Sequence, residues 1–169
     1  ERRRGRMNDL DHLRNLLGRY TERIDAGDFA GVGALFERGG LAGGEGPPFV
    51  VGAAAVAAFY AGGTRLHHGG PGTKHLVSGT VFAEPGPEGT LTARSSYLVL
   101  QAAPGLPLQP IITGRYEDTF ARSGLETDGW RDGGWYFQLR RFHVDLVGDL
   151  THPLQQPGLA DPPPVPPEG

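Results

Sequence analysis

The stretch "YTERIDAGD", residues 20–28, places a tyrosine, Tyr20, five residues before a carboxylate, Asp25, and both side chains can handle protons; His75, one of six histidines in the chain, is of a third type that can. A neutral imidazole is a competent base near neutral pH, and a carboxylate on its second nitrogen fixes the tautomer and stabilises the imidazolium that forms. Tyrosine keeps its proton at pH 7 and can donate it to a carbonyl, an enolate or a departing hydroxyl. Together, such groups could abstract a proton beside an activating group and expel a leaving group across the adjacent bond.

The first two of these residues belong to an amphipathic segment that must position them. Its apolar residues repeat at spacings of three and four: Leu10, Leu13, Leu17, Tyr20 and Ile24. This spacing predicts a helix with one buried stripe, started by Asn8 or Asp9 and ended at Gly27. At about 100° per residue, Asp25 lies some 140° from Tyr20 around the axis, so both can face one cavity only if the helix end stands at its mouth. The alternative is a buried tyrosine, a solvated helix-end acid and an ordinary strand histidine.

The remaining elements follow from periodicity. Asp28 is the expected N-cap of a short helix, "FAGVGALF", which precedes a glycine-rich loop, "RGGLAGGEGPP", and an alanine-rich helix, "VGAAAVAAFYAGG". From His75 onward the pattern becomes strand-like. The expected strands are "KHLVSGTVFAE", "TLTARSSYLVLQA", "IITGRYEDTFARS" and "WYFQLRRFHVDLV", with "APGLPLQP" as a loop between the second and the third. Helices followed by a curling antiparallel sheet predict an α+β fold.

Length and composition limit the class of protein. The 169 residues suit one domain, and the absence of cysteine excludes disulfides, thiolate metal sites and a cysteine nucleophile. No apolar run approaches the roughly 20 residues that span a bilayer, and the first ten residues lack the apolar centre of a secretory signal. We therefore expect a soluble, cytoplasmic protein that binds no membrane.

Charge divides the chain into parts. Residues 1–6 hold four of the 16 basic residues and one of the 19 acidic ones, which leaves 12 basic against 18 acidic in the rest. A domain with this balance is a poor nucleic-acid binder. We expect a flexible basic extension at residues 1–7, a domain at residues 8–152 and a proline-rich, polyproline-like tail at residues 153–169.

The order of three helices and a long-stranded curved sheet resembles the nuclear transport factor 2-like superfamily, specifically its SnoaL-like branch. The segments that carry the resemblance are "YTERIDAGDFAGVGALF", "TKHLVSGTV", "GRYEDTF" and "LRRFHVDLVGDLTHPL". The resemblance implies a cone-shaped barrel in which a strongly bent sheet wraps the first helix and leaves a deep pocket, and a homodimer paired through the outer face of the sheet. It does not fix the activity, because the fold hosts dehydratases, isomerases, cyclases and binding modules.

The resemblance also implies roles for particular residues. Bile-acid dehydratases and their relatives use a tyrosine and an aspartate five residues apart on the first helix, and a histidine that starts the first long strand. Tyr20, Asp25 and His75 match that pattern. Related dehydratases place a ligand-binding arginine on the final strand, where Arg140 and Arg141 stand. Strand alternation lets only one of these two point inward, and the pattern of their neighbours does not choose between them.

One departure from the family pattern concerns an acid on the second long strand. Here that strand reads "ARSSYLV", which contains no carboxylate. Tyr97 is a candidate substitute as a hydroxyl donor, although a packed strand tyrosine is the commoner case. Asp118 in "GRYEDTF" can enter the pocket or face solvent.

Two histidine-containing stretches invite a metal interpretation. His67 and His68 are adjacent in the sequence, and the last predicted strand ends in a polar stretch that contains two more histidines and two aspartates: His143, Asp145, Asp149 and His152. Adjacent histidines seldom bind one ion on regular structure, and the expected carboxylate partner is not evident. We expect no metal and no cofactor.

Three functions remain open. The first is a cofactor-free lyase or isomerase acting on a hydrophobic, polycyclic or polyketide-like molecule. The second is a non-catalytic protein that binds a small apolar metabolite in its pocket. The third is an interaction module that uses the sheet to join a larger assembly. Contact between His75 and Asp25 in a roomy cavity favours the first, whereas a filled interior with an exposed apolar sheet face favours the third.

Overall fold

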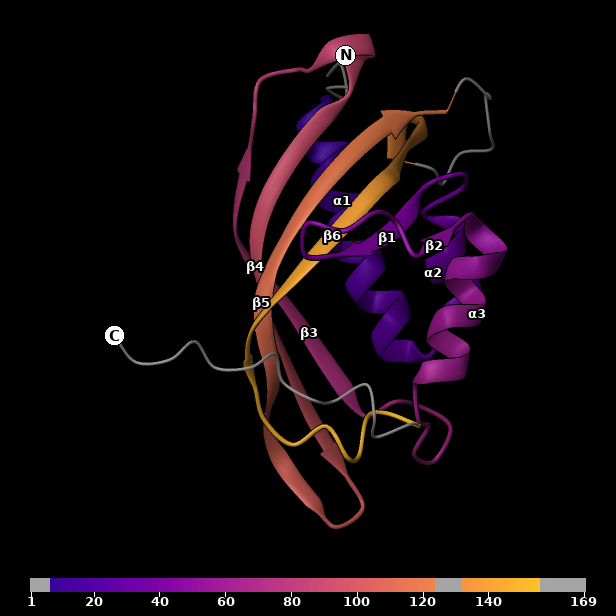
Figure 1. Ribbon diagram of the computed structural model, residues 1–169, viewed down its shortest axis with the longest axis vertical. Helices are drawn as coiled ribbons and strands as arrows, with labels where there is room; N and C mark the ends of the chain where they lie inside the picture. Colours follow the sequence, from indigo (N-terminus) through magenta and orange to yellow (C-terminus); the bar gives the residue numbers. More distant parts are fainter. Residues whose placement is uncertain (1–6, 124–131, 156–169) are drawn as a thin grey trace, which may run out of the picture.

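The computed structural model describes residues 7–123 and 132–155. Its α-helices are α1 (Asp9–Ala26), α2 (Phe29–Ala34) and α3 (Ala53–Gly63). Its strands are β1 (Gly40–Gly43), β2 (Val50–Val51), β3 (Thr73–Phe82), β4 (Leu91–Ala103), β5 (Leu106–Arg122) and β6 (Trp135–Val147). The helices lie together on one side of a curved sheet (Figure 1), which confirms the predicted α+β fold.

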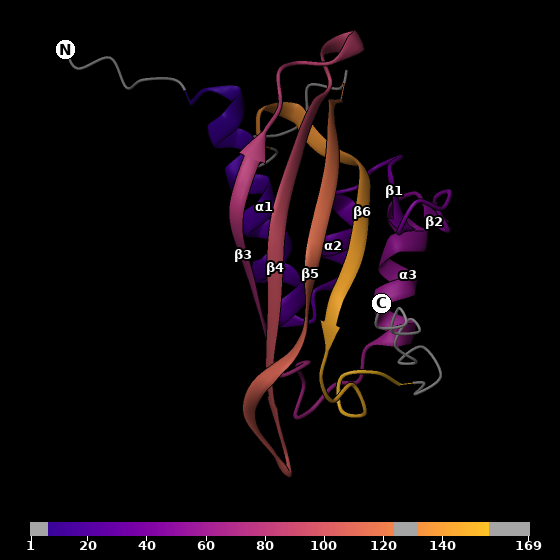
Figure 2. The same cartoon turned by 60° about the vertical axis from the view of Figure 1, so that its left-hand side comes forward.

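The sheet has the order β2-β1-β6-β5-β4-β3 and is not closed, with β2 and β3 at its two edges. The long strands β3 to β6 are antiparallel, as expected, whereas β1 runs parallel to β6. Figure 2 shows these strands curving around α1. The cone-shaped barrel that the family resemblance implied is therefore an open, strongly bent sheet and not a closed barrel.

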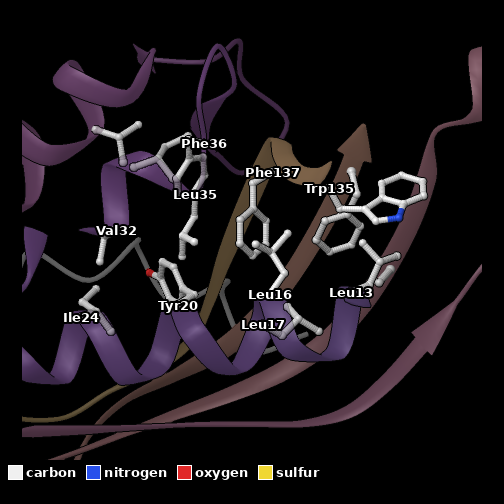
Figure 3. Close-up of a cluster of buried hydrophobic side chains, with 14 of the residues drawn as sticks. Leu13, Leu16, Leu17, Tyr20, Ile24, Val32, Leu35, Phe36, Trp135 and Phe137 are labelled. Carbon is white, nitrogen blue, oxygen red and sulfur yellow. The ribbon is translucent and has the colours of Figure 1, made fainter. Parts of the chain in front are cut away.

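Helix α1 forms as its sequence predicts. The side chain of Asn8 accepts a hydrogen bond from the backbone of Asp11, and Gly27 ends the helix with φ of +73°, a conformation that favours glycine. One residue of the expected stripe is wrong: Leu10 is 36% exposed, and Leu16 is buried instead. The stripe packs against Phe137 and Trp135 of β6 (Figure 3), so the core lies between this helix and the sheet.

The glycine-rich segment contains two strands that the sequence did not predict. Strand β1 pairs with both β2 and β6. A Cβ atom on Gly39 would lie 1.9 Å from the carbonyl oxygen of Phe137, and one on Gly40 would lie 2.3 Å from that of Val50. Glycine is needed here because neighbouring backbone approaches closely, so the glycines mark a tight strand rather than a loop.

A second difference concerns the segment "APGLPLQP", which was expected to be a loop. Strand β5 begins at Leu106, inside that segment, and Leu106 pairs with Ala103 of β4. The turn is therefore short. The two prolines of β5 do not prevent pairing, because irregularities in the β4–β5 register lie beside this end of the strands.

Two surface features complete the description. Hollows of about 440 Å³ and about 190 Å³ lie on strands β3 to β6; exposed Arg94 and Glu117 line both, and the buried Asp118 also lines the larger one. Within residues 7–123 and 132–155, no helix is long and apolar enough to cross a membrane.

Candidate active site

Asp25 and His75 meet where the end of α1 lies beside the start of β3. The Nδ1 atom of His75 lies 2.6 Å from Oδ1 of Asp25, and the backbone N–H of His75 donates to Oδ2 at 2.9 Å. The hydroxyl of Thr73 donates to Oδ1 at 3.0 Å. A carboxylate can only accept, so the ring contact places the imidazole proton on Nδ1. The side chains of His75 and Asp25 are 13% and 9% exposed.

These contacts control the ionisation of the acid. Burial alone would raise the pKa of Asp25, but the hydrogen bonds from the ring and backbone of His75 and from Thr73 outweigh it and hold the pKa below its ordinary value. Asp25 is therefore ionised at neutral pH. With Nδ1 occupied, the Nε2 atom of His75 has no hydrogen-bond partner among the described residues, which leaves it available to accept a proton.

The angular separation of Tyr20 and Asp25 on α1 is accommodated by the sheet. Tyr20 points into the core, whereas Asp25 points to the flank of the helix that β3 covers. His75 reaches both residues, because its ring also meets the ring of Tyr20 edge to face at 6.4 Å between centroids. The structure thus brings together the three residues that the sequence singled out.

Tyr20 is packed on all sides. Its hydroxyl lies 2.9 Å from that of Tyr60 on α3, and its ring makes edge contacts with Tyr60, Tyr116 and Phe137 at centroid distances of 6.4, 6.3 and 6.1 Å. Figure 3 shows its hydroxyl directed away from α1. Burial, together with the neighbouring Tyr20, raises the pKa of Tyr60 well above its ordinary value. Tyr60 therefore keeps its proton at neutral pH, and the rings around Tyr20 fill this part of the interior.

Arg140 lies fully buried in the same region. Its Nε and Nη2 atoms donate to the two carboxylate oxygens of Asp118 at 2.8 and 2.7 Å. Because both oxygens accept, we assign the pair as ionised. Burial acts to lower the pKa of Arg140, but attraction to Asp118 outweighs it and raises the pKa above its ordinary value. The guanidinium carbon also lies 4.1 Å from the ring of Tyr20 and 4.0 Å from that of Tyr116.

A bulge in β6 decides which arginine points inward. The β5–β6 register shifts between Thr119, which pairs with Leu139, and Phe120, which pairs with Phe137. The extra residue lets Phe137 and Arg140 both face the core although they are three positions apart. Arg141 consequently points to the other side, where its Nη1 donates to the carbonyls of Gly44 and Gly46 at 2.5 and 2.6 Å.

The other two candidates also face inward. Asp118 is 2% exposed, so the solvent-facing alternative is wrong for this residue. Tyr97 stacks on Tyr116 at 4.4 Å and donates to the carbonyl of His143 at 3.2 Å. Burial raises the pKa of Tyr97 to about 12. Its hydroxyl is already engaged with protein backbone.

The two hollows on the sheet lie away from the Asp25–His75 pair. Neither is lined by Tyr20, Asp25 or His75. The metal interpretation has no structural support either, since no group of three or more metal-ligating side chains comes together within the described part of the chain. His67 instead contacts the carbonyl of His152 at 2.9 Å.

Sequence reasoning missed two residues of the site. Thr73 orients Asp25 through its hydroxyl. Its only signal in the sequence is its position two residues before His75, which puts both side chains on the same face of the strand. Tyr60 lies four positions after Val56, the buried residue of α3, so the helical repeat placed it on the inward edge of that helix. The alanine-rich context hid this signal.

Comparison with known proteins identifies the family. The sequence profile described as the SnoaL-like domain matches residues 5–141, most of the chain. The chain belongs to the SnoaL-like family. No protein among the curated sequences matches it.

Solved structures agree with this fold. The SnoaL-like chain is similar to ActVI-ORFA from Streptomyces coelicolor (20% identity, 80% of this chain and 96% of that one, TM-score 0.62). It is also similar to an NTF2-like protein with a cystatin-like fold from Novosphingobium aromaticivorans (24% identity, 85% and 86%, TM-score 0.64). A protein from the same organism, provisionally named a scytalone dehydratase, aligns at 19% identity over 83% and 87% with TM-score 0.63. Likeness at these identities shows the fold alone.

Proposed function

We propose that this SnoaL-like protein is a cofactor-independent lyase or isomerase that acts by general acid–base catalysis on a hydrophobic, polycyclic or polyketide-like molecule. The observation that carries the proposal is the 2.6 Å contact between His75 and Asp25 beside the phenol of Tyr20. A histidine held by an ionised carboxylate, with its other nitrogen free, is the arrangement a general base requires.

The contacts of His75 and Asp25 and the family resemblance of Tyr20 support the following roles. The Nε2 atom of His75 removes a proton from the carbon beside a carbonyl, and Asp25 stabilises the imidazolium that forms. Tyr20 gives its proton to the departing hydroxyl, which leaves as water while the carbon–carbon double bond forms. The imidazolium proton then returns to the Tyr20 phenolate. In an isomerisation the proton is returned to another carbon instead and no water leaves.

Arg140 has a narrower role than the family resemblance implies. Its charge is balanced by Asp118, and its guanidinium is enclosed by the rings of Tyr20 and Tyr116. Its Nη1 is buried without a hydrogen-bond partner among the described residues. We propose that Nη1 of Arg140 donates a hydrogen bond to a neutral acceptor of the ligand, such as a carbonyl oxygen. The surrounding rings must move apart to admit the ligand.

The filled interior favours one rival function, that of a subunit that joins an assembly through its sheet. The outer face exposes Leu76 and Leu146 at 46% and 70%. Homodimerisation through this face is our proposal for the partner. Light scattering coupled to size-exclusion chromatography on Leu76→Asp and Leu146→Asp variants tests it, with dissociation expected and an unchanged mass contradicting it.

Proton abstraction can be tested before the product is known. Hydroxylated polycyclic ketones are incubated in D₂O, and exchange of the proton next to the carbonyl is followed by NMR, with loss of water followed by mass spectrometry. We expect exchange catalysed by the wild type and reduced about 10²- to 10⁴-fold in His75→Gln. His68→Asn, which changes an exposed histidine outside the site, is the matched control. Equal exchange in His75→Gln and wild type would overturn the proposal.

A further inference from the structure

Helix α3 is apolar around its whole circumference, yet only one of its residues is buried. It contains alanine, valine, phenylalanine and glycine, with Tyr60 as its one polar side chain, and Val56 is the residue in the core. A helix that is apolar all round is normally covered on all sides. The side of α3 that faces away from α2 therefore lacks the polar residues expected of a surface helix.

The uncovered residues form one continuous surface, which we call the α3 apolar face. It consists of Ala54, Ala55, Ala58, Phe59, Ala61 and Gly62, all exposed. At about 100° per residue these positions span an arc of about 160°. Phe49, 50% exposed, extends the surface because its ring packs on that of Phe59 at 5.3 Å.

The chain leaves the described structure beside this face. The backbone N–H of Gln155 donates to the carbonyl of Gly63 at 2.9 Å, and its side chain donates to that of Thr64 at 2.8 Å. Leu154 forms a bridge with Thr64. These contacts fix residue 155 at the C-terminal end of α3, so the 14 residues that follow start from the edge of the α3 apolar face.

We propose that residues 156–161 of the same chain dock along the α3 apolar face. This segment carries Pro157 and Leu159, and five more prolines follow it in the chain. Proline-rich segments dock on aromatic-lined apolar surfaces with little loss of conformational entropy. Attachment at residue 155 makes the encounter intramolecular, which favours this segment over the same segment of a second copy.

Length and charge support one direction. The 11 residues of α3 span about 16 Å, a distance that about five residues of polyproline helix cover at roughly 3.1 Å each. Counted from Gln155, five to six residues reach Asp161. The N-cap of α3 is Gly52, which has no side chain to cap the helix, although the backbone N–H of Ala53 donates to the carbonyl of Glu37 at 2.7 Å; an aspartate arriving there would meet the positive end of the helix.

Amide hydrogen exchange of the full chain tests the proposal. Compared with wild type, Leu159→Ser and a chain ending at Gln155 should both speed exchange in α3 and increase binding of the dye ANS. Asp161→Ala should speed exchange at Ala54 and Ala55 by about two- to fivefold. Glu168→Ala, which removes an acid beyond the reach of α3, is the control and should leave α3 unchanged.

Two outcomes would overturn the proposal. Exchange in α3 and ANS binding that are the same with and without residues 156–169 would mean that the segment does not cover the face. Protection of α3 that disappears on dilution, together with a loss of mass by light scattering, would assign the face to a second copy. Circular dichroism shows whether the chain that ends at Gln155 keeps its fold. If that chain does not fold, α3 exchange and ANS binding of the full-length Leu159→Ser variant decide the question.

Discussion

The Nδ1 atom of His75 lies 2.6 Å from Oδ1 of Asp25, although fifty residues separate them in the chain. Asp25 lies in the last turn of α1, and His75 is the third residue of the edge strand β3. The two meet because β3 covers the flank of α1 that Asp25 faces. This contact accounts for the lowered pKa of Asp25 and fixes the tautomer of His75. The lowered pKa also defines the pH range over which Asp25 stabilises the folded protein.

Asp25→Asn should remove a pH-dependent part of the stability. The pKa of Asp25 is lower in the folded state than its ordinary value of 3.8. Its stabilisation is therefore present above the unfolded-state pKa and is lost as pH falls through the folded-state pKa. We expect the free energy of unfolding of wild type to exceed that of Asp25→Asn from neutral pH down to about pH 4, and the difference to shrink below it.

Urea denaturation at a series of pH values measures this difference. Asp145→Asn is the control, because that carboxylate pairs with Arg115 at an exposed position. Its effect should stay below about 1 kcal/mol at every pH. A difference between wild type and Asp25→Asn that grows as the pH falls would contradict the assignment of a stabilised carboxylate.

The buried Arg140–Asp118 pair should tolerate joint removal better than single removal. Arg140→Met leaves the Asp118 carboxylate buried and unpaired, which should cost about 3–5 kcal/mol of unfolding free energy. The double variant Arg140→Met/Asp118→Leu should recover most of that loss. Urea denaturation of both single variants and the double variant checks this, and Arg115→Met at the exposed pair should cost less than about 1 kcal/mol. Additive losses would show that the two side chains do not act as a pair.

The two phenols of Tyr20 and Tyr60 should be energetically coupled. Each hydroxyl has the other as its hydrogen-bond partner at 2.9 Å, so Tyr20→Phe and Tyr60→Phe should each cost about 0.5–1.5 kcal/mol. The double variant should lose less than the sum of the two. A double-mutant cycle by chemical denaturation measures the coupling, and strictly additive losses would rule out the hydrogen bond.

Glycines in and near β1 should be irreplaceable, in contrast to a glycine of α3. A Cβ atom on Gly40 would lie 2.3 Å from the carbonyl oxygen of Val50, whereas one on Gly62 would meet nothing within 4 Å. Gly40→Ala should therefore lower the melting temperature, since the β1–β2 pairing must shift. Gly62→Ala should be neutral or stabilising by up to about 1 kcal/mol, because alanine is the better helix former. Thermal unfolding followed by circular dichroism compares the two, and equal effects would show that β1 is not a paired strand.

Periodicity was sufficient for α1 and the long strands, because one-sided burial leaves a regular spacing in the sequence, whereas α3 was predicted from its alanine-rich composition. Strand β6 was predicted with its observed ends, and α1 differed only at Leu10. Strands β1 and β2 were missed because they have only four and two residues, too few to show a side-chain pattern, and are held by backbone pairing. Such pairing becomes visible only when the partner strand β6 is placed beside them.

The site residues could be predicted where a family pattern gives their spacing. They could not be predicted where a local irregularity of the strand determines which side chain faces the core. Tyr20, Asp25 and His75 follow a spacing that the resemblance supplies. The choice between Arg140 and Arg141 depends on the bulge after Phe137, which breaks the alternation on which the sequence argument relied. The rings packed around Tyr20 were also not foreseen, because they come from four separate elements.

The tautomer of His75 tests the central claim most directly. Two-bond ¹H–¹⁵N correlation NMR of the imidazole, recorded at a pH where the ring is neutral, shows which nitrogen carries the proton. We predict a proton on Nδ1 that is held by Asp25, and a change in this assignment in Asp25→Ala but not in Asp145→Asn. A neutral ring with its proton on Nε2, or a spectrum that is the same with and without the Asp25 carboxylate, would contradict a general base positioned by that acid.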